Sequence, residues 1–597
     1  MALSCHGRIH SCRTNRMNLL HSVLSLLVIW LASISSCCCA ADAIDLNSRL
    51  DTINLPDCYG KTQSLKQLRG GGIVVFAFVG TECPLAKLYG PRLQALSQRF
   101  ADSGVRFVGV AANVQDTLSE VVAWADRAGI QLPVLMDSEQ TLADLLSAVR
   151  TPEVVVLDGA GNTRYQGRID DQYGIGIARL QPMHEDLAVA LQSLIDGAVP
   201  AVTSTPSVGC QIGRRKSVPP HGEITFSRHI APIFHARCLE CHRADQIAPF
   251  PLTSYADTAG WEATIAEVIR DDRMPPWNAN PAFGHFRNDV RLSAEEKRLI
   301  LQWIENGCPE GAAEDLPEAP LFASGWRMPE PDLVIHVRDQ PYQVPAVGVV
   351  DYQYFQVDPG FQEDTFVTAA EARPGNAAVV HHIIAFLQIP GQKDVSLGKM
   401  LIGYAPGTSP LTFPPGAAMR VPAGSRILFE MHYTPNGTAQ SDRSYIGLKL
   451  TDASHVRHEV VGLEAINQKF QIPAHASSHV VIAKEKFREE ITLLSLTPHM
   501  HLRGKAFRYD ALWPDGTSET LLDVPRYDFN WQLRYEFAEP KVIPPGTVVT
   551  CTATFDNSSS NPNNPDPTQV VTWGQQSWEE MMIGFFTGIR TTPTTNP

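Results

Sequence analysis

Proline and glycine interrupt this chain at short intervals along its whole length. The 597 residues include 44 Pro and 42 Gly, and both residue types favour turns and end regular elements. A helical bundle is therefore excluded, and we expect strands joined by turns over at least half of the chain. Hydrophobic residues make up 44% and charged residues 19%, as in globular proteins. The length corresponds to roughly four domains.

The first 43 residues are typical of a targeting segment. Three arginines precede a run without charged side chains over 17–41, and its apolar centre is typical of a signal peptide. A box at 34–37 resembles a lipoprotein signal in which Cys37 would carry a lipid anchor, and an uncleaved membrane anchor is a further alternative. We therefore expect export to a bacterial periplasm or outer cell surface. The net charge of −14 argues against nucleic acid as a partner.

Residues 45–200 alternate strand-like and helical segments, which predicts an α/β domain. The apolar run 72–79 is a predicted buried parallel strand, and it leads through Cys83 into a predicted helix over 85–100. The dipole at a helix N-terminus lowers the pKa of a thiol placed there. Cys83 is therefore a candidate catalytic nucleophile.

This segment resembles a redoxin domain of the thioredoxin or peroxiredoxin kind, and Thr151-Pro152 resembles the cis-proline turn of that superfamily. The second cysteine of the superfamily's C-x-x-C motif is Ala86 here, so a dithiol mechanism within one motif is excluded. Cys83 could still act as a one-cysteine nucleophile with Cys210 or Cys58 as its resolving partner. The alternative is a scaffold that has kept one thiol.

The pentapeptide Cys238-Leu239-Glu240-Cys241-His242 is the C-x-x-C-H pattern of covalent haem attachment. Two thiols three residues apart on a helical turn can reach both vinyl groups of haem c, while His242 ligates the iron. Met274 precedes a proline and is therefore expected on an extended loop, where its thioether is the predicted sixth ligand. Residues 222–312 resemble a small, all-α class I cytochrome c. Less favoured ligands are His229 and His235.

From about residue 325 onward, short apolar runs broken by Pro and Gly predict a β-sandwich. The histidines there gather in three motifs, which are His381-His382, His432-Tyr433 and His499-Met500-His501. An H-x-H pair on a strand places both imidazoles on one face, and imidazoles without an acidic neighbour favour copper or zinc. Adjacent His381 and His382 would point to opposite faces, so one metal can bind both only if the start of that strand is distorted.

These motifs resemble the copper type II, ascorbate-dependent monooxygenase family over residues from about 325 to 595. The resemblance implies two jelly-roll-like sandwiches, over 331–456 and 457–597, with one copper ion each. It implies that the electron-reservoir copper is held by His381, His382 and His432. It implies that the copper that reacts with dioxygen is held by His499, His501 and Met581. A thioether ligand stabilises Cu(I), which gives the mixed ligand set a physical logic.

The chain also departs from that family. The family's disulfides are absent, since Cys551 is the only cysteine after Cys308. Peptide-amidating members place an Arg two residues before the H-x-H, where this chain has Thr497, and an Asn and a Tyr after the methionine, where it has Ile583 and Phe585. We therefore expect a more apolar pocket without a clamp for a peptide carboxylate, and the substrate stays an unknown small organic molecule or peptide.

The leading hypothesis is an exported multidomain copper monooxygenase with two copper ions and one covalently attached haem c. Linkers at 201–221 and 313–330 would separate its domains. Dioxygen would hydroxylate a C–H bond, and a small reductant or redox protein would supply electrons through the haem. One alternative is a copper and haem electron-transfer or redox-sensing protein without oxygenase activity. Another is a thiol peroxidase or disulfide oxidoreductase that acts through Cys83.

Overall fold

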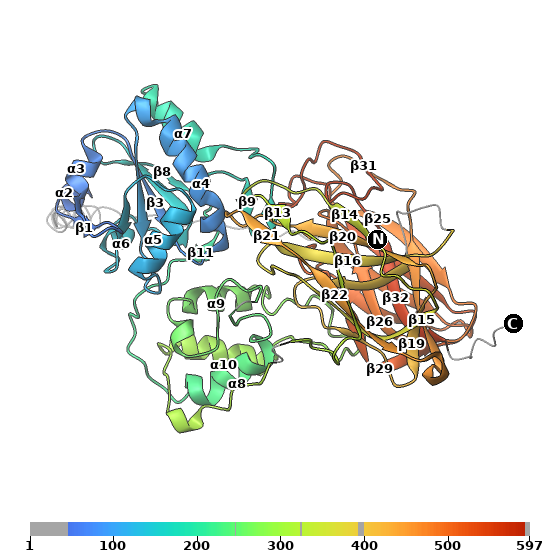
Figure 1. Ribbon diagram of the computed structural model, residues 1–597. Coiled ribbons are helices and arrows are strands. Elements are labelled where there is room, and N and C mark those ends of the chain that lie inside the picture. The colour runs from blue at the N-terminus through green and yellow to red at the C-terminus, as the bar shows by residue number, and fades with distance from the viewer. Residues whose placement is uncertain (1–45, 245, 323–324, 392–398, 591–597) are drawn as a thin grey trace, which may run out of the picture.

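The computed structural model describes residues 46–244, 246–322, 325–391 and 399–590. The predicted signal segment, with Cys37, lies outside these residues. Figure 1 shows an α/β unit and a helical segment on one side of a large all-β region. Within the described ranges, no helix has both the length and the apolar character needed to cross a membrane.

The α/β unit is built on a five-stranded sheet of order β5-β4-β3-β7-β8, in which β3 pairs parallel with β4 and antiparallel with β7. Its strands are β3 (Val74–Val79), β4 (Arg106–Ala111), β5 (Val134–Met136), β7 (Glu153–Leu157) and β8 (Thr163–Gly167). Its longer helices are α4 (Pro84–Arg99), α5 (Leu118–Arg127) and α7 (Asp186–Ile195). Alternate residues of β3 enter two hydrophobic cores, one on each face of the sheet. The predicted thioredoxin-like α/β fold is confirmed.

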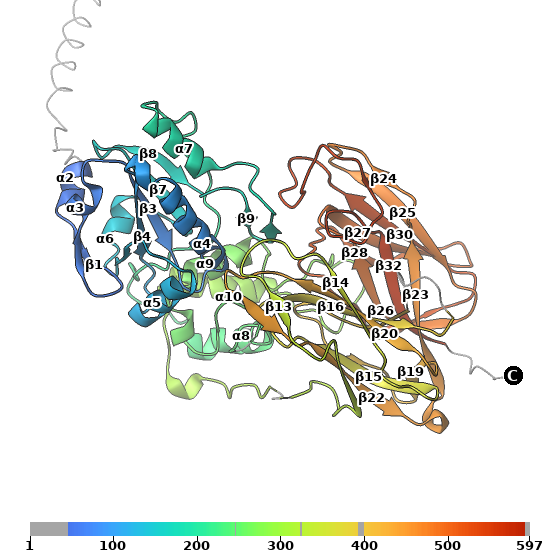
Figure 2. The same ribbon diagram turned by 45° about the horizontal axis from the view of Figure 1, so that its top comes forward.

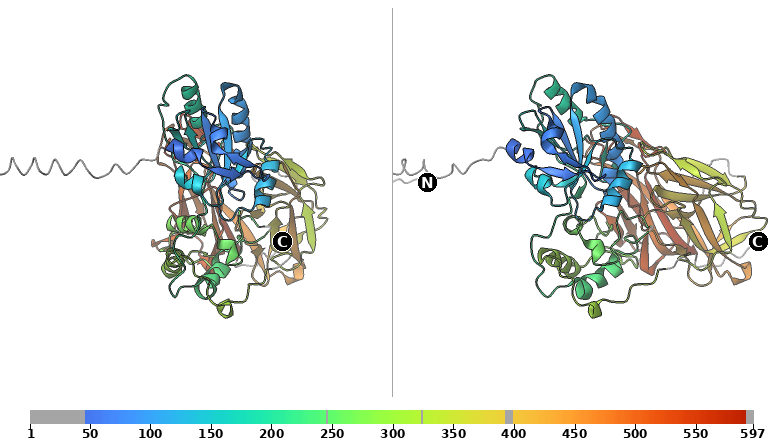
Figure 3. Two further views of the ribbon diagram at one scale, coloured as in Figure 1. Left: turned by 90° about the vertical axis from the view of Figure 1, so that its left-hand side faces the viewer. Right: turned by 60° about the vertical axis from the view of Figure 1, so that its left-hand side comes forward.

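The helical segment follows the α/β unit and lies beside it in two views of Figure 3. Its helices are α8 (Ala231–Arg237), α9 (Glu262–Arg270) and α10 (Ala294–Glu305). They share a core in which Phe226, Phe234, Trp261 and Trp303 are buried. Ser293 caps α10 through a capping box with Glu296.

The all-β region consists of two sandwiches side by side (Figure 2). One nine-stranded sheet runs through both, with the parallel pair β19 (Ala417–Val421) and β23 (His458–Ile466) at its centre. In the first sandwich, β12 (Leu333–His336), β22 (Tyr445–Thr451), β15 (Thr365–Arg373) and β19 pack against a sheet of β14 (Gln353–Val357), β20 (Arg426–Tyr433), β16 (Val380–Gln388) and β17 (Lys399–Tyr404). In the second, β23, β32 (Ile583–Arg590), β26 (Ile491–His499) and β29 (Tyr535–Ile543) pack against a sheet of β25 (His479–Lys486), β30 (Val548–Phe555), β27 (Gly504–Leu512) and β28 (Ser518–Val524). The predicted β-rich C-terminal region is confirmed.

Candidate functional site

Three imidazoles meet where β16 pairs with β20. His382 lies opposite His432 in the antiparallel ladder, and the register shifts between Val380 and His382, so His381 occupies a β-bulge. A bulge re-aims a side chain, and here it turns His381 toward the face used by His382. The ring centroids of His381 and His432 are 4.7 Å apart and those of His382 and His432 are 5.0 Å apart. One nitrogen from each ring lies within 4.8 Å of the others.

The nitrogens of this cluster fit a metal ion. Nε2 of His381, Nε2 of His382 and Nδ1 of His432 are buried without a hydrogen-bond partner, which is costly unless something binds them. Burial, followed by the neighbouring His382, lowers the pKa of His381 to about 3. Burial also lowers the pKa of His432 well below its usual value. Neutral imidazoles with free lone pairs are the form that ligates copper or zinc.

The cluster has one acidic neighbour that the sequence argument did not include. Glu430 precedes His432 by two residues on β20, so the two side chains share a face of the strand. Its Oε1 lies 3.5 Å from Nε2 of His382, and its Oε2 accepts a hydrogen bond of 2.9 Å from the Tyr354 hydroxyl. The expectation of imidazoles without a carboxylate nearby was therefore wrong.

The second histidine pair straddles the end of a strand. His499 is the last residue of β26, whereas His501 lies beyond it in a turn closed by the bond from Gly504 N–H to its carbonyl. The prediction of both histidines on one strand was therefore wrong, yet their rings are 5.2 Å apart. Nδ1 of His499 lies 2.7 Å from Gln532 Oε1, and Nδ1 of His501 lies 3.2 Å from the Glu579 carbonyl. Burial lowers the pKa of His499 to about 4, and Nε2 of His501 is buried without a partner.

A buried glutamate joins this pair to the C-terminal strand. The Glu580 carboxylate accepts the backbone N–H of His501 at 2.8 Å and that of Arg503 at 2.6 Å. Met581, the next residue, is therefore held beside the His501 turn. Met581 is buried but lies outside the hydrophobic core of the second sandwich, whereas Met582 belongs to that core. This difference favours Met581 over Met582 as a ligand, because the side chain of Met582 is part of the core.

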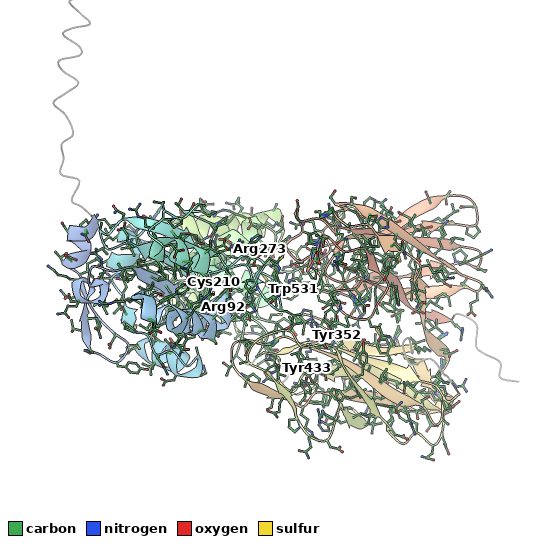
Figure 4. All side chains as sticks on the ribbon, turned by 90° about the horizontal axis from the view of Figure 1, so that it is seen from above. Arg92, Cys210, Arg273, Tyr352, Tyr433 and Trp531 are labelled. Carbon is green, nitrogen blue, oxygen red and sulfur yellow. The ribbon has the colours of Figure 1, made fainter. Side chains whose placement is uncertain are left out.

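One histidine of each group, His382 from the first and His499 from the second, lines a common cavity of about 80 Å³. The ring of Tyr352, labelled in Figure 4, lies 5.2 Å from that of His382 and 6.4 Å from that of His501. Its hydroxyl is buried and has no hydrogen-bond partner. Tyr352 and Gln532 were missed by the sequence analysis, because both lie in irregular segments where no spacing marks them.

The C-x-x-C-H residues form the expected turn after α8. The N–H of His242 donates to the Cys238 carbonyl at 2.9 Å. Its Nδ1 lies 3.0 Å from the Phe250 carbonyl, which leaves Nε2 available for a metal. Cys238 and Cys241 are free thiols, and burial raises the pKa of Cys238 to about 12. These groups fit a covalently attached haem. Met274 lies on the loop after α9, and within the described part of the chain its side chain makes no hydrogen bond or ring contact with His242.

The thiol of Cys83 lies at the N-terminus of α4, as predicted. It is 2% exposed, and its Sγ donates to the Thr151 carbonyl at 2.9 Å. The Thr151-Pro152 peptide bond is cis, which confirms that prediction. Burial opposes ionisation of Cys83, but hydrogen bonds from the thiol and the backbone N–H of Cys210 outweigh it and lower the pKa to about 6.

Comparison with known proteins identifies one part of the chain. Residues 46–166 match the AhpC/TSA family. Similar solved structures include a hypothetical protein from Sinorhizobium meliloti, with 27% identity over 27% of this chain and 89% of that one and a TM-score of 0.25. An uncharacterized conserved protein from Geobacillus kaustophilus is 25% identical over 28% of this chain and 90% of its own chain, with a TM-score of 0.26. A secreted disulfide oxidoreductase from Mycobacterium tuberculosis is 15% identical over 25% of this chain and 97% of its own chain, with a TM-score of 0.20. No curated protein matches.

Residues 46–166 are therefore an AhpC/TSA redoxin domain, and this family indicates an oxidoreductase in general. The match ends at residue 166, and the histidine groups and the C-x-x-C-H turn lie outside it.

Proposed function

We propose that the chain is a copper-dependent monooxygenase. The observation that carries this proposal is the cluster of His381, His382 and His432, each with a buried ring nitrogen that makes no hydrogen bond. His382 and His499 line the same cavity. One copper would be held by His381, His382 and His432, and the other by His499, His501 and Met581. Bound copper would supply one-electron redox chemistry and dioxygen activation for hydroxylation of a C–H bond.

The chain's own residues would orient these ligands. Gln532 and the Glu579 carbonyl each engage Nδ1 of a histidine, which directs the other ring nitrogen into the site. Glu580 fixes the turn between His501 and Arg503 through two backbone hydrogen bonds. Cys238, Cys241 and His242 would hold one haem c in the helical segment, which would supply electrons one at a time.

The walls of the cavity favour a neutral, largely apolar substrate. Thr497 and Phe585, which replace the residues of a carboxylate clamp, both line it. Arg534 also lines it, but this guanidinium is already engaged by Glu536 at 2.7 Å and by two backbone carbonyls. A larger cavity of about 460 Å³ shares Phe585 and Met400 with the first, is also lined by Lys399, Glu464 and Glu485, and has room for a small organic molecule.

The variant Met581→Ala tests this function. We expect ascorbate-driven oxygen uptake with apolar C–H substrates to fall by at least about tenfold, because loss of a direct ligand should cost no less than loss of a supporting residue. Copper content by mass spectrometry and oxygen uptake by electrode are measured together. Met582→Leu is the matched control, since Met582 belongs to the core, and its uptake should be unchanged. Equal uptake in Met581→Ala and the unaltered protein would instead favour an electron-transfer or redox-sensing protein without oxygenase activity.

A second function, thiol peroxidase or disulfide oxidoreductase activity through Cys83, is favoured by the AhpC/TSA match. Since the pKa of Cys83 is lowered to about 6, its thiolate fraction rises with pH and is half complete near pH 6. We expect the rate of alkylation by a small reagent to follow this curve, and Cys210→Ala to move the midpoint upward because it removes a hydrogen-bond donor. Cys83→Ser should abolish peroxide consumption. Consumption that persists in Cys83→Ser would contradict this second function.

A further inference from the structure

Cys210 lies outside the matched redoxin segment but next to its nucleophile. It belongs to the short strand β11 (Cys210–Gln211), which pairs antiparallel with β6 (Arg150–Thr151), so that Cys210 lies opposite Thr151. Cys83 donates to the carbonyl of that same Thr151. Cys83 and Cys210, which are more than a hundred residues apart in the sequence, therefore both lie next to Thr151.

The backbone around Cys210 is adapted to this approach. Gly209 has φ +148°, and a Cβ at this position would lie 2.0 Å from the Thr151 carbonyl oxygen, so a side chain there would push β11 away from Thr151. Arg150 donates to the Gly209 carbonyl at 2.9 Å. The Cys210 thiol, in turn, donates to Cys83 and thereby lowers the pKa of Cys83. β11 therefore presents its sulfur to the nucleophile.

The same strand is also held by the helical segment. The backbone N–H of Gln211 donates to Thr264 Oγ1 on α9 at 3.2 Å. Glu267 on α9 accepts from the Gln211 side chain at 2.7 Å and from Arg150 at 2.8 Å. The Cys210 side chain packs against the cores of both units, and Figure 4 labels it where they meet. The position of Cys210 therefore depends on contacts from two domains.

We propose that Cys83 and Cys210 form a reversible disulfide, with Cys210 as the resolving thiol that takes the place of the cysteine missing at Ala86. This inference deepens the second function proposed above. The Cys83 thiolate attacks the O–O bond of a hydroperoxide, which gives a sulfenic acid and releases an alcohol or water. The Cys210 thiol then attacks the sulfenic sulfur, the S–S bond forms and water leaves. A dithiol reductant restores both thiols by exchange and is itself oxidised to a disulfide.

Peptide mapping of the full-length protein tests the proposal. After treatment with hydrogen peroxide or with the dithiol oxidant diamide, we expect a linked Cys83–Cys210 peptide that disappears on reduction with a dithiol. Cys58→Ser, the control at another buried cysteine of the same domain, should leave this link unchanged. Cys210→Ser should instead leave Cys83 as a sulfenic acid that a dimedone probe traps. Circular dichroism confirms that each variant folds, and mapping of the unaltered protein decides the matter if Cys210→Ser does not.

The outcomes separate this inference from the peroxidase function. A Cys83–Cys210 link with diamide but no peroxide consumption supports the disulfide and contradicts the peroxidase. Peroxide consumption that persists in repeated turnovers of Cys210→Ser, with no such link in the unaltered protein under either oxidant, contradicts the disulfide and keeps the peroxidase. A link between Cys83 and Cys58 in the unaltered protein also overturns the proposal.

Discussion

Replacing His432 with Ala is expected to remove copper from the β16–β20 cluster and to leave the fold intact. His432 is the member that lies closest to both partners, with ring centroids at 4.7 Å from His381 and 5.0 Å from His382. Supporting residues around a metal typically contribute 10–100-fold to affinity, so loss of a direct ligand should weaken binding by more than about 100-fold. Competition with a copper chelator measures this change, and total copper should fall from two equivalents toward one.

The thermal stability of the metal-free protein should change little in this variant. Nδ1 of His432 is buried without a partner, and such a group costs on the order of 1–3 kcal/mol. Removing the ring removes that cost, although it also leaves a small cavity. We therefore expect little loss of thermal stability without copper, and a smaller stabilisation by added copper than in the unaltered protein.

His455→Ala is the matched control for His432→Ala. His455 lies in the exposed 3-10 turn Ala453–His455, outside the three motifs, so His455→Ala should bind copper like the unaltered protein. Copper affinity and stoichiometry that are unchanged in His432→Ala would contradict the proposed centre. Zinc in place of copper after loading with both metals would preserve the site but contradict the redox function.

Several backbone features of this arrangement could be predicted from the residues next to them in the sequence. Adjacent residues of a regular strand point to opposite faces, so His381 and His382 can bind one metal only where the backbone is distorted. The structure has a bulge at that point. The strand-to-helix position of Cys83 also follows from the local pattern, whereas the cis bond at Thr151-Pro152 was expected only from the resemblance to the thioredoxin superfamily.

Features that depend on tertiary contacts could not be predicted in this way. The sequence treats His499 and His501 as one strand face, but Glu580, almost eighty residues later, fixes a turn at His501. Likewise, pairing of Cys210 with Thr151 depends on how β11 returns to the α/β unit. The place of Tyr352 between two histidine groups depends on the packing of two sandwiches.

The helical segment contacts the β region close to the proposed copper centre. Arg327 binds Glu240, inside the C-x-x-C-H turn, at 2.7 Å and also donates to the Thr408 carbonyl at 2.8 Å. Tyr404, at the end of β17, is half-buried, and the loss of solvent around its hydroxyl, followed by the nearby Cys241, raises its pKa to about 12. Tyr404 and Thr408 line the cavity that contains His382 and His499. Cys241, one of the two thiols that would hold a haem c, therefore lies near a wall of that cavity, and the bound haem would supply electrons one at a time.

This contact leads to a prediction about the source of electrons. In His242→Ala, the rate at which a reduced c-type cytochrome converts Cu(II) to Cu(I) should fall by more than roughly 100-fold, because the variant lacks a direct iron ligand. Reduction by ascorbate, a small molecule that reaches the cavity directly, should be unchanged. The Cu(II) electron paramagnetic resonance signal follows both reactions.

His235→Ala is the matched control for this measurement, since His235 lies half-buried on α8 of the same helical segment. It should behave like the unaltered protein with either donor. If His235→Ala lost reduction by the cytochrome while His242→Ala kept it, the assignment of the iron ligand would be wrong. Equal slowing with both donors in His242→Ala would mean that the histidine supports the fold of the copper centre and that electrons do not pass through the haem. Arg327→Ala separates contact from ligation, because it should slow only the cytochrome-driven reaction while the haem spectrum stays the same.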